Sequence, residues 1–434
     1  MPLRVTRMLQ IKGTLIAGCL GALVFAMPAT AAAPAASGRL LVGFEKAVSK
    51  ERQSDILAAA GGRIGRRFSA RIRGGRLAVV RPRSGKATDA LGKRLRRTDG
   101  VAYAEPDFIL QKSQEKTPDD PFYTLDYALV DSPQDYDIDA PTAWTTRTSC
   151  AKVAILDTGI DTDHPDLASN VYKSDDKPNN GKDDDKNGYV DDTYGWNVIN
   201  GKGSGQDDNG HGTHVSGIVA GRGNNANGSS GICWSAKLVA VKFMNSKGKG
   251  STSDAIDGID YAVKNGAKIV NCSFGSSSKS NALHDAVDYA QDHNVLLVVA
   301  AGNDSESIDK NPEYPASYTD SNILTVAAST DTDTLASFSN FGSTAVDVAA
   351  PGDNIFSTYL NGGYKYLSGT SMAAPYVSGT AALLRKQESD ATYGQLRKAI
   401  REKVDKPPAL NGKVVYNGRL NVQKALAAIP GLVD

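Results

Sequence analysis

The chain contains a run of hydroxyl side chains, "SGTSMAAP" (368–375), directly before a stretch with the small apolar pattern of a buried helix. A serine hydroxyl is a weak nucleophile at neutral pH. It becomes reactive only when a base lies within hydrogen-bond reach and a third group orients that base. This run therefore has catalytic meaning only if the chain also supplies a histidine and a carboxylate.

The candidate base comes from a short set of histidines: His164, His211, His214, His284 and His293. His211 lies between two glycines in "DDNGHGTHVSGIVAG" (207–221), where a loop gives way to an apolar helix, so its side chain can be held rigidly and left open on one side. His214 fits a buried or capping role, and His284 and His293 are expected at the surface. Zinc is the alternative for the pair, but the H-E-x-x-H pattern is absent.

The candidate carboxylate is Asp157, in "AKVAILDTGIDTDHPDL" (151–167). Val153–Leu156 is a short apolar run bounded by a turn, which predicts a buried parallel strand with Asp157 at its carboxyl end. Catalytic groups in open α/β sheets gather at that end. An aspartate that closes a strand is more often a cap or a turn former, so only its combination with the histidine and the serine favours catalysis.

At this point the chain resembles the subtilisin-like serine proteases. The phrases "DTGI", "HGTH" and "GTSMAAP" occur in the family's order Asp, His, Ser, and the resemblance runs from about residue 120 to the end. It implies that Ser371 is the nucleophile and that His211 is the general base and later the acid. Asp157 would then hold the tautomer of the imidazole and stabilise its charge.

The same resemblance extends to "NVLLVVAAGNDS" (294–305), a predicted buried strand that ends at a Gly-Asn pair. It implies that Asn303 donates its side-chain amide to the oxyanion of the tetrahedral intermediate. It also implies that two segments, 248–253 and 273–276, flank an extended substrate that pairs as an added strand. The implied substrate-binding residues are Gly248, Gly250, Ser273, Phe274, Gly275, Ala300, Ala301 and Gly302.

The specificity of the implied protease depends on Glu313 in "NPEYPASY" (311–318). By the resemblance, Glu313 precedes a Tyr-Pro pair that follows the base of the primary specificity pocket. A carboxylate there would favour Lys or Arg before the scissile bond, whereas a solvent-exposed Glu313 would have no such effect. Both readings stay open, and Lys112 and Lys116 near the expected junction are compatible with the first.

Metal binding is suggested by the acidic phrase "NNGKDDDKNGYVDD" (179–192), whose spacing reproduces the first half of an EF-hand loop. The predicted calcium ligands are Asp183, Asp185, Asn187, the Tyr189 carbonyl, Asp191 and Asp192. The twelfth position is Tyr194, so the usual glutamate is missing, and Asp192 is its expected substitute. A second calcium site is implied by the resemblance at Asp166 and Asn225, in a loop that carries an insertion.

The first residues predict a secretory signal peptide, 1–31. Cations at Arg4, Arg7 and Lys12 precede an apolar run, and small residues follow it, with cleavage expected near Ala31. A lipoprotein signal at Cys19 is the alternative, although the apolar run continues past that cysteine. No other apolar run is long enough to span a bilayer.

The segment after the signal is basic. Residues 32–115 hold 18 Lys and Arg against 8 Asp and Glu, a net charge of +10, whereas 117–434 hold 27 against 40, a net charge of −13. Strand-like and helix-like runs argue against a flexible nucleic-acid-binding arm. By resemblance, 32–116 is an inhibitory prodomain with a small α+β, ferredoxin-like fold, and its charge would favour association with the acidic part.

The remaining part, 117–434, alternates helix and strand patterns, which predicts an α/β domain with a parallel sheet flanked by helices. For example, a helical stripe lies between the apolar runs "KLVAVKFM" and "KIVNCSF". Cys150 and Cys233 each precede a strand, and the strands would be neighbours in the family's sheet, so a disulfide between them is expected to be feasible. Cys272 is expected to be a buried free thiol.

Together these features predict a secreted, self-processing serine endopeptidase stabilised by calcium. Its expected partners are protein and peptide substrates and its own prodomain, with no nucleic acid, no membrane span and a monomeric state. A calcium-dependent binding module would explain only the acidic loop. A lipase-like hydrolase would need G-x-S-x-G and the order Ser, Asp, His, and neither is present.

Overall fold

The structure is a computed structural model that describes residues 35–69, 76–83, 88–108, 115–130 and 133–433. The predicted signal peptide, with Cys19, and Lys112 lie outside these residues. The described residues form two compact units, one within Met1–Lys112 and the other within Ser113–Asp434. No helix among the described residues is long and apolar enough to cross a membrane.

The first unit is a four-stranded antiparallel sheet with two helices, in the strand order β2-β3-β1-β4. Its elements are β1 (Ala35–Phe44), α1 (Lys50–Ala60), β2 (Gly62–Arg67), β3 (Leu77–Pro82), α2 (Thr88–Leu95) and β4 (Val101–Phe108). Its core joins alternate residues of β1, such as Leu40 and Val42, to Leu57 of α1 and Leu91 of α2. This β-α-β-β-α-β order confirms the predicted ferredoxin-like α+β unit.

The second unit is built on a seven-stranded parallel sheet in the order β11-β10-β9-β8-β5-β7-β6. Its strands are β5 (Ser149–Asp157), β6 (Trp196–Asn197), β7 (Ser235–Lys242), β8 (Ile269–Cys272), β9 (Leu296–Ala300), β10 (Ile323–Ser329) and β11 (Val348–Pro351). The strands are nearly continuous apolar runs because both faces of the sheet are covered. This architecture confirms the predicted α/β fold class.

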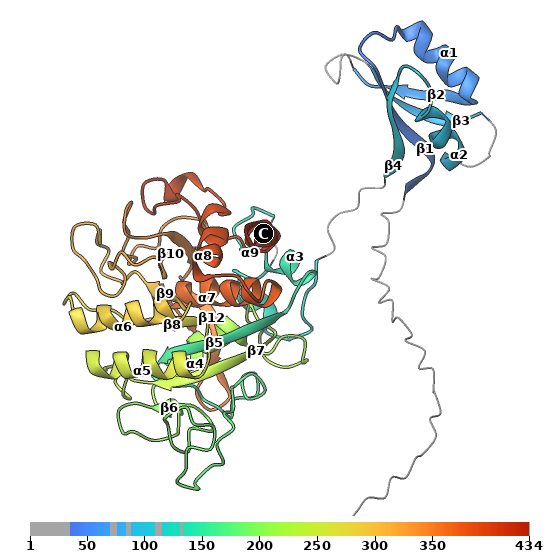
Figure 1. Ribbon diagram of the computed structural model, residues 1–434. Coiled ribbons are helices and arrows are strands. Elements are labelled where there is room, and N and C mark those ends of the chain that lie inside the picture. The colour runs from blue at the N-terminus through green and yellow to red at the C-terminus, as the bar shows by residue number, and fades with distance from the viewer. Residues whose placement is uncertain (1–34, 70–75, 84–87, 109–114, 131–132, 434) are drawn as a thin grey trace, which may run out of the picture. The chain divides into compact units, whose positions relative to one another are not determined.

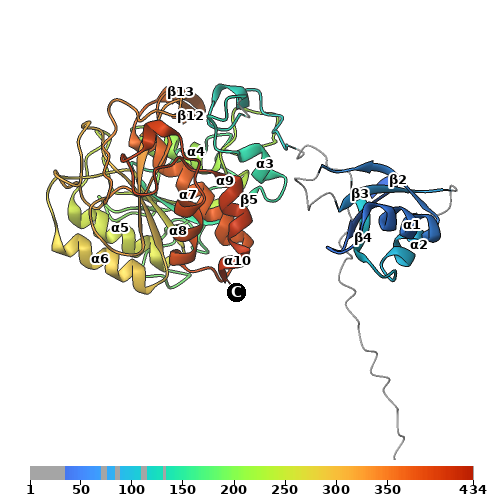
Figure 2. The same cartoon turned by 90° about the horizontal axis from the view of Figure 1, so that it is seen from above.

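Helices cover the sheet on two faces (Figures 1 and 2). Val153 and Ile155 of β5 share a core with α4 and α7, whereas the alternate residues Ala154 and Leu156 share another with α5 and α6. The helices are α3 (Ala140–Trp144), α4 (His211–Ala220), α5 (Thr252–Lys264), α6 (Asn281–Asp292), α7 (Thr370–Gln387), α8 (Tyr393–Glu402), α9 (Val422–Ala428) and α10 (Pro430–Val433). The smaller elements are two 3-10 helices, η2 (Tyr123–Leu125) and η3 (Pro408–Leu410), and a hairpin of β12 (Ile355–Tyr359) and β13 (Gly363–Leu367).

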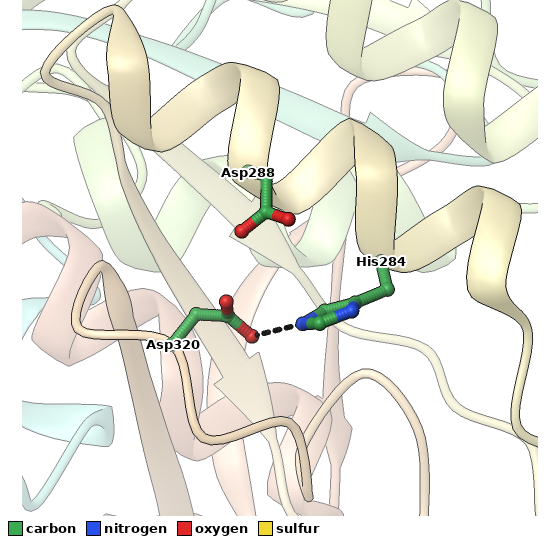
Figure 3. Close-up of side chains that lie close together, drawn as sticks. All are labelled: His284, Asp288 and Asp320. Carbon is green, nitrogen blue, oxygen red and sulfur yellow. Dashed lines mark hydrogen bonds and ion pairs between the residues drawn. The ribbon is translucent and has the colours of Figure 1, made fainter.

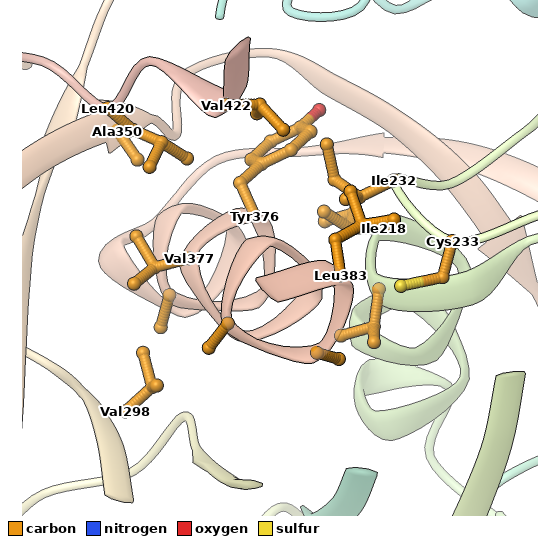
Figure 4. Packing of buried hydrophobic residues seen from close by; sticks show 14 of the residues in the cluster. Ile218, Ile232, Cys233, Val298, Ala350, Tyr376, Val377, Leu383, Leu420 and Val422 are labelled. Atoms are coloured by element: carbon orange, nitrogen blue, oxygen red, sulfur yellow. The ribbon is translucent and has the colours of Figure 1, made fainter. Parts of the chain in front are cut away.

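Helix α7 is buried along most of its length (Figure 4). Its Tyr376 and Leu383 pack in the same core as Ile218 of α4, Val298 of β9 and Val422 of α9. Small residues in its first turns let the helix lie close to the sheet. The amino end of α7 is therefore held rigidly where it meets the carboxyl ends of the strands.

Two of the cysteines form a disulfide and one is a free thiol, as expected from the sequence. Cys150 in β5 and Cys233 before β7 form a disulfide with a Cα–Cα separation of 5.7 Å. Cys272 in β8 is a buried free thiol. In the chain-entropy model, a bridge that closes so long a loop stabilises the fold by roughly 4 to 5 kcal/mol at most.

Candidate active site

Asp157 and His211 meet at the carboxyl end of the sheet. Strand β5 ends at Asp157, which is fully buried, and α4 begins at His211, whose side chain is 27% exposed. His211 Nδ1 lies 2.7 Å from Asp157 Oδ1. Glycine at 212 permits this approach, because a Cβ there would lie 2.1 Å from the carbonyl oxygen of Gly159. The pair leaves Nε2 of the imidazole as the nitrogen available to a substrate-side partner.

The electrostatic environment favours a proton on His211. Burial of the ring opposes its protonation, but the charge of Asp157 and the hydrogen bond to it outweigh burial, so the pKa of His211 is raised above its ordinary value. An imidazolium formed when His211 accepts a proton is therefore stabilised. His214, one turn later, has its pKa lowered by burial to about 4, which fits a neutral core residue.

Ser371 lies in the first turn of α7. Among the described residues, the hydrogen-bond partner of Ser371 Oγ is the carbonyl oxygen of Ser273 (3.2 Å), not His211. The hydroxyl would have to rotate for a base at His211 to take its proton, and such loose geometry is common in catalytic sites without substrate.

A second bond between the same two serines follows from Pro375. Proline has no N–H, so the carbonyl oxygen of Ser371, four residues earlier, has no partner within the helix. That oxygen accepts a hydrogen bond from Ser273 Oγ at 3.0 Å instead. The amino end of α7 is thereby tied to the segment after β8.

Asn303 follows β9 and is held by its side-chain oxygen. Its Oδ1 accepts hydrogen bonds from the backbone N (2.8 Å) and the Oγ1 (3.0 Å) of Thr370, which leaves Nδ2 to face the amino end of α7. Asn303 Nδ2 and the Ser371 backbone N both lie 3.6 Å from the point that a Cβ of Gly369 would occupy. The missing side chain of Gly369 thus leaves a space flanked by two N–H donors, a geometry suited to an oxyanion.

A cleft of about 510 Å³ opens beside His211. Five of the predicted substrate-binding residues line it: Gly248, Gly250, Ser273, Phe274 and Gly275. Ala300 and Ala301 are buried at the end of β9 and are not among the residues that line this cleft. Gly302 has a φ of +104° and its backbone N donates to Thr370 Oγ1.

Glu313 lies against the segment after β8. A Cβ at Gly275 would lie 2.6 Å from Glu313 Oε1, and one at Gly302 would lie 3.6 Å from its Cγ, so the carboxylate occupies the space that these two glycines leave. Two backbone hydrogen bonds between Ser276 and Tyr314 (2.9 and 2.8 Å) hold the Glu313 loop there. Burial, with a smaller contribution from Asp304, raises the pKa of Glu313. Its side chain is therefore neither free in solvent nor paired with a cation among the described residues.

The acidic loop brings three carboxylates together: Asp176, Asp183 and Asp185 each offer one oxygen within 4.8 Å of the others. Burial and the charges of Asp192, Asp176 and Asp183 raise the pKa of Asp185. Such mutual repulsion among hard oxygen ligands fits a Ca²⁺ site, since the cation would relieve it. The sequence analysis missed Asp176, which precedes the EF-hand-like phrase.

The other predicted ligands of this loop differ in placement. Asn187 Nδ2 donates to Asp192 Oδ2 (2.9 Å) and to Asp185 Oδ2 (3.3 Å), so Asn187 and Asp192 lie with the acidic group. Tyr189 donates its backbone N–H to Asn187 Oδ1 (2.8 Å). Asp191 instead accepts from the backbone of Asn180 and Gly181, and its carboxylate closes the other end of the loop.

A second polar group surrounds Asp166, which is fully buried. Its Oδ1 accepts from the side-chain amides of Asn225 and Asn227, both at 3.0 Å, and its Oδ2 accepts from the hydroxyl of Tyr364 at 2.8 Å. Asp120 joins this group. Burial raises the pKa of Asp120, and Asp166 contributes to the rise. These oxygen donors also fit Ca²⁺, and the sequence analysis missed Asp120, about 45 residues away in the chain.

Comparisons with known proteins agree with this geometry. The sequence profile of the Subtilase family matches residues 149–419, and that of the Fervidolysin N-terminal prodomain matches residues 24–107. Thermitase of Thermoactinomyces vulgaris is 38% identical over 313 residues, 71% of this chain and 99% of thermitase. A thermophilic serine proteinase of Bacillus sp. (strain AK1) is 35% identical over 399 residues, 90% of this chain and 87% of that protein.

Solved structures give the same assignment. A protease from Pseudoalteromonas arctica PAMC 21717 superposes with a TM-score of 0.62 and 29% identity, over 72% of this chain and all of the other. A cold-adapted subtilisin-like serine proteinase superposes with a TM-score of 0.55 and 27% identity, over 71% of this chain and 99% of the other. The similarity thus covers most of the second unit in both sequence and structure.

Proposed function

Because the chain belongs to the subtilase family of serine proteases, we propose that it is a secreted serine endopeptidase, made as a zymogen that processes itself, with Ser371, His211 and Asp157 as its triad. The observation that carries this proposal is the 2.7 Å contact between His211 Nδ1 and buried Asp157, at the strand ends where α7 presents Ser371. A buried carboxylate that orients a partly exposed histidine beside a cleft is the arrangement that a serine protease requires.

In the proposed reaction, Ser371 Oγ attacks the scissile carbonyl carbon while His211 takes its proton. Asp157 fixes the tautomer of His211 and stabilises the imidazolium. The oxyanion receives hydrogen bonds from Asn303 Nδ2 and the Ser371 backbone N. His211 then protonates the leaving amine, and a water molecule, deprotonated by His211, hydrolyses the acyl-enzyme.

The proposed domain division is a signal peptide (1–31), an inhibitory prodomain (32–116) and a catalytic domain (117–434). The prodomain assignment is supported by the family match over 24–107 and by the ferredoxin-like fold of the first unit. The opposite net charges of the two parts favour their association. The processed protein is proposed to be a monomer that acts on protein and peptide substrates.

Processing tests the proposed function directly. Residues 32–434 are expected, in the presence of calcium, to release a basic fragment that ends between about 110 and 120, and then to digest casein. Mass spectrometry and sequencing of the new amino terminus give the site. A chain that stays intact and folded, yet never digests casein, would contradict the proposal.

Asn303→Ala is expected to lower kcat by about 10² to 10³ with little change in KM, the loss known for one such donor in subtilisin, a member of the same family. The reason is that Nδ2 interacts with the oxyanion and not with the substrate carbonyl. Kinetics on a chromogenic peptide give the split between kcat and KM. An effect confined to KM would show that Asn303 binds the ground state instead.

Glu313→Gln tests the proposed preference for Lys or Arg before the scissile bond. The substitution is expected to lower kcat/KM for a lysyl substrate about tenfold relative to a leucyl one, because a charge-assisted contact in a partly buried pocket contributes roughly 1.5 kcal/mol. The two substrates are matched in all other positions. An unchanged ratio would mean that Glu313 does not contact the substrate.

Calcium is proposed as a structural ion at the Asp176, Asp183 and Asp185 group, and at Asp166 with Asp120 and Asn225. Chelation is expected to lower Tm, because an ion at 100 times its Kd stabilises the folded state by about 2.7 kcal/mol. Thermal unfolding of the Ser371→Ala chain in excess EGTA and in excess Ca²⁺ measures this without self-digestion. Equal Tm values would contradict both sites, and Asp183→Asn would report on the first alone.

A further inference from the structure

A histidine and two aspartates outside the proposed active site and the two proposed calcium sites point into one space (Figure 3). His284 and Asp288 project from α6, four residues apart and so on one helix face, and Asp320 lies in the loop before β10. His284 Nε2 and Asp320 Oδ2 are 2.9 Å apart, and all three residues offer ligand atoms within 4.8 Å of one another.

The two elements that carry these side chains are fixed to each other by other groups. The hydroxyl of Tyr318 donates to the Ser280 carbonyl at the start of α6 (2.5 Å), and the Tyr318 ring stacks on His284 at 4.8 Å between centroids. Buried Asn322 donates to the carbonyls of Val287 and Val295, at 3.1 and 3.2 Å. The cluster is thus positioned by its surroundings, as a preorganised ligand set requires.

We propose that His284, Asp288 and Asp320 bind a divalent transition-metal ion of the Zn²⁺ type. One imidazole and two carboxylates suit such an ion, whereas Ca²⁺ takes oxygen ligands alone. His284 and Asp288 have the i, i+4 spacing of the two histidines in zinc helices, with a carboxylate in place of the second histidine. Three protein ligands leave a position for water, and the side chains of His284 (37% exposed) and Asp320 (11%) are open on one side, so an ion can enter.

The bound ion would tie α6 to the loop before β10. That loop continues from Tyr314, which exchanges two backbone hydrogen bonds with Ser276. The ion therefore stabilises the folded protein at a place that neither calcium site touches. The proposal does not depend on the protease assignment, because none of its three ligands takes part in the proposed chemistry.

The test is a Zn²⁺ titration by calorimetry of the Ser371→Ala chain in excess Ca²⁺, repeated with Co²⁺, whose visible absorption reports an imidazole-carboxylate environment. We expect one Zn²⁺ ion bound per chain, with a Kd that His284→Asn and Asp320→Asn each raise at least tenfold. Asp288→Asn, at an exposed position where folding is not at risk, is expected to do the same. His293→Asn removes a histidine at the end of the same helix and should bind as the parent does.

Thermal unfolding without metal shows whether each variant is folded. A Zn²⁺-dependent rise in Tm in the parent and in His293→Asn, absent from Asp288→Asn, is the expected companion result. Equal stoichiometry and affinity in the parent and in all three ligand variants would overturn the proposal. So would the absence of any bound equivalent in the folded parent.

Discussion

Ser371→Ala is expected to lower kcat by about 10⁶, the loss known for the nucleophile of subtilisin in the same family, and to leave the prodomain attached. The reason is that the variant keeps the cleft, Asn303 and the His211–Asp157 pair but has no atom to form the acyl-enzyme. Casein hydrolysis and the mass of the incubated chain measure the two effects together.

The matched control is Ser368→Ala, three residues earlier in the same phrase. Ser368 is exposed, and its Oγ accepts a hydrogen bond from the Asn354 backbone (2.8 Å) without facing the cleft. This variant should process itself and digest casein at nearly the parent rate. Equal losses of casein hydrolysis in Ser371→Ala and Ser368→Ala would mean that substitutions in segment 368–375 act by disturbing the fold. Processing by Ser371→Ala in isolation from active protease would exclude Ser371 as the nucleophile.

Asp157→Asn is expected to lower kcat by about 10⁴, because an amide can no longer hold the required tautomer of His211 or stabilise its charge. The substitution should also move the acid limb of the pH profile. Burial lowers the pKa of His211, and Asp157 is the main cause that raises it, with a smaller contribution from Asp207. Without Asp157 the pKa falls, the base stays neutral to lower pH, and the limb shifts to lower pH.

Kinetics across pH 5 to 9 on a peptide substrate give both the loss in kcat and the position of the acid limb. Kinetics at pH 7 alone would give only the loss in kcat. Asp163→Asn, an exposed carboxylate on the same loop, serves as the control and should leave the limb in place. A limb that moves to higher pH in Asp157→Asn would show that another group sets the charge of His211. A loss below tenfold would remove Asp157 from the triad.

The sequence predicted the parts of the site that lie in short phrases. Asp157 follows an apolar run bounded by a turn, and His211 opens a helix after a glycine, so each position can be derived from a local pattern. The α/β class and the ferredoxin-like unit followed from the alternation of elements and from the family resemblance. These local signals suffice to locate the proposed catalytic residues because each of them stands at the end of an element.

The sequence could not predict which groups meet across long separations. Asp120 and Asp176 lie outside the recognised motifs, and only the folded chain brings them beside Asp166 and Asp183. Whether Glu313 faces solvent depended on the approach of its loop to Gly275, which the local pattern does not encode. The direction of Asp191 likewise depends on tertiary packing, and so does the position of Ala300 and Ala301 away from the lining of the cleft.

The rotamer of Ser371 illustrates the same limit at atomic scale. The phrase "GTSMAAP" marks the serine but does not predict the bond of its hydroxyl to the Ser273 carbonyl or the bond from Ser273 Oγ to the Ser371 carbonyl. Only the second of these bonds follows from the missing N–H of Pro375. Both serines are thus held by the packing of α7 on β8. Substrate binding in the cleft is expected to replace the first bond and to leave the second in place.

The most direct test of the central claim is covalent labelling of the processed protein with phenylmethylsulfonyl fluoride, read by peptide mass spectrometry. The proposed mechanism predicts one label per chain, on Ser371 alone, with complete loss of casein hydrolysis. Labelling should fall sharply in His211→Ala that the parent enzyme has processed in trans, because the hydroxyl then lacks its base. Full casein hydrolysis by a protein whose Ser371 is labelled, or a label on a different serine in the active protein, would contradict the proposed triad.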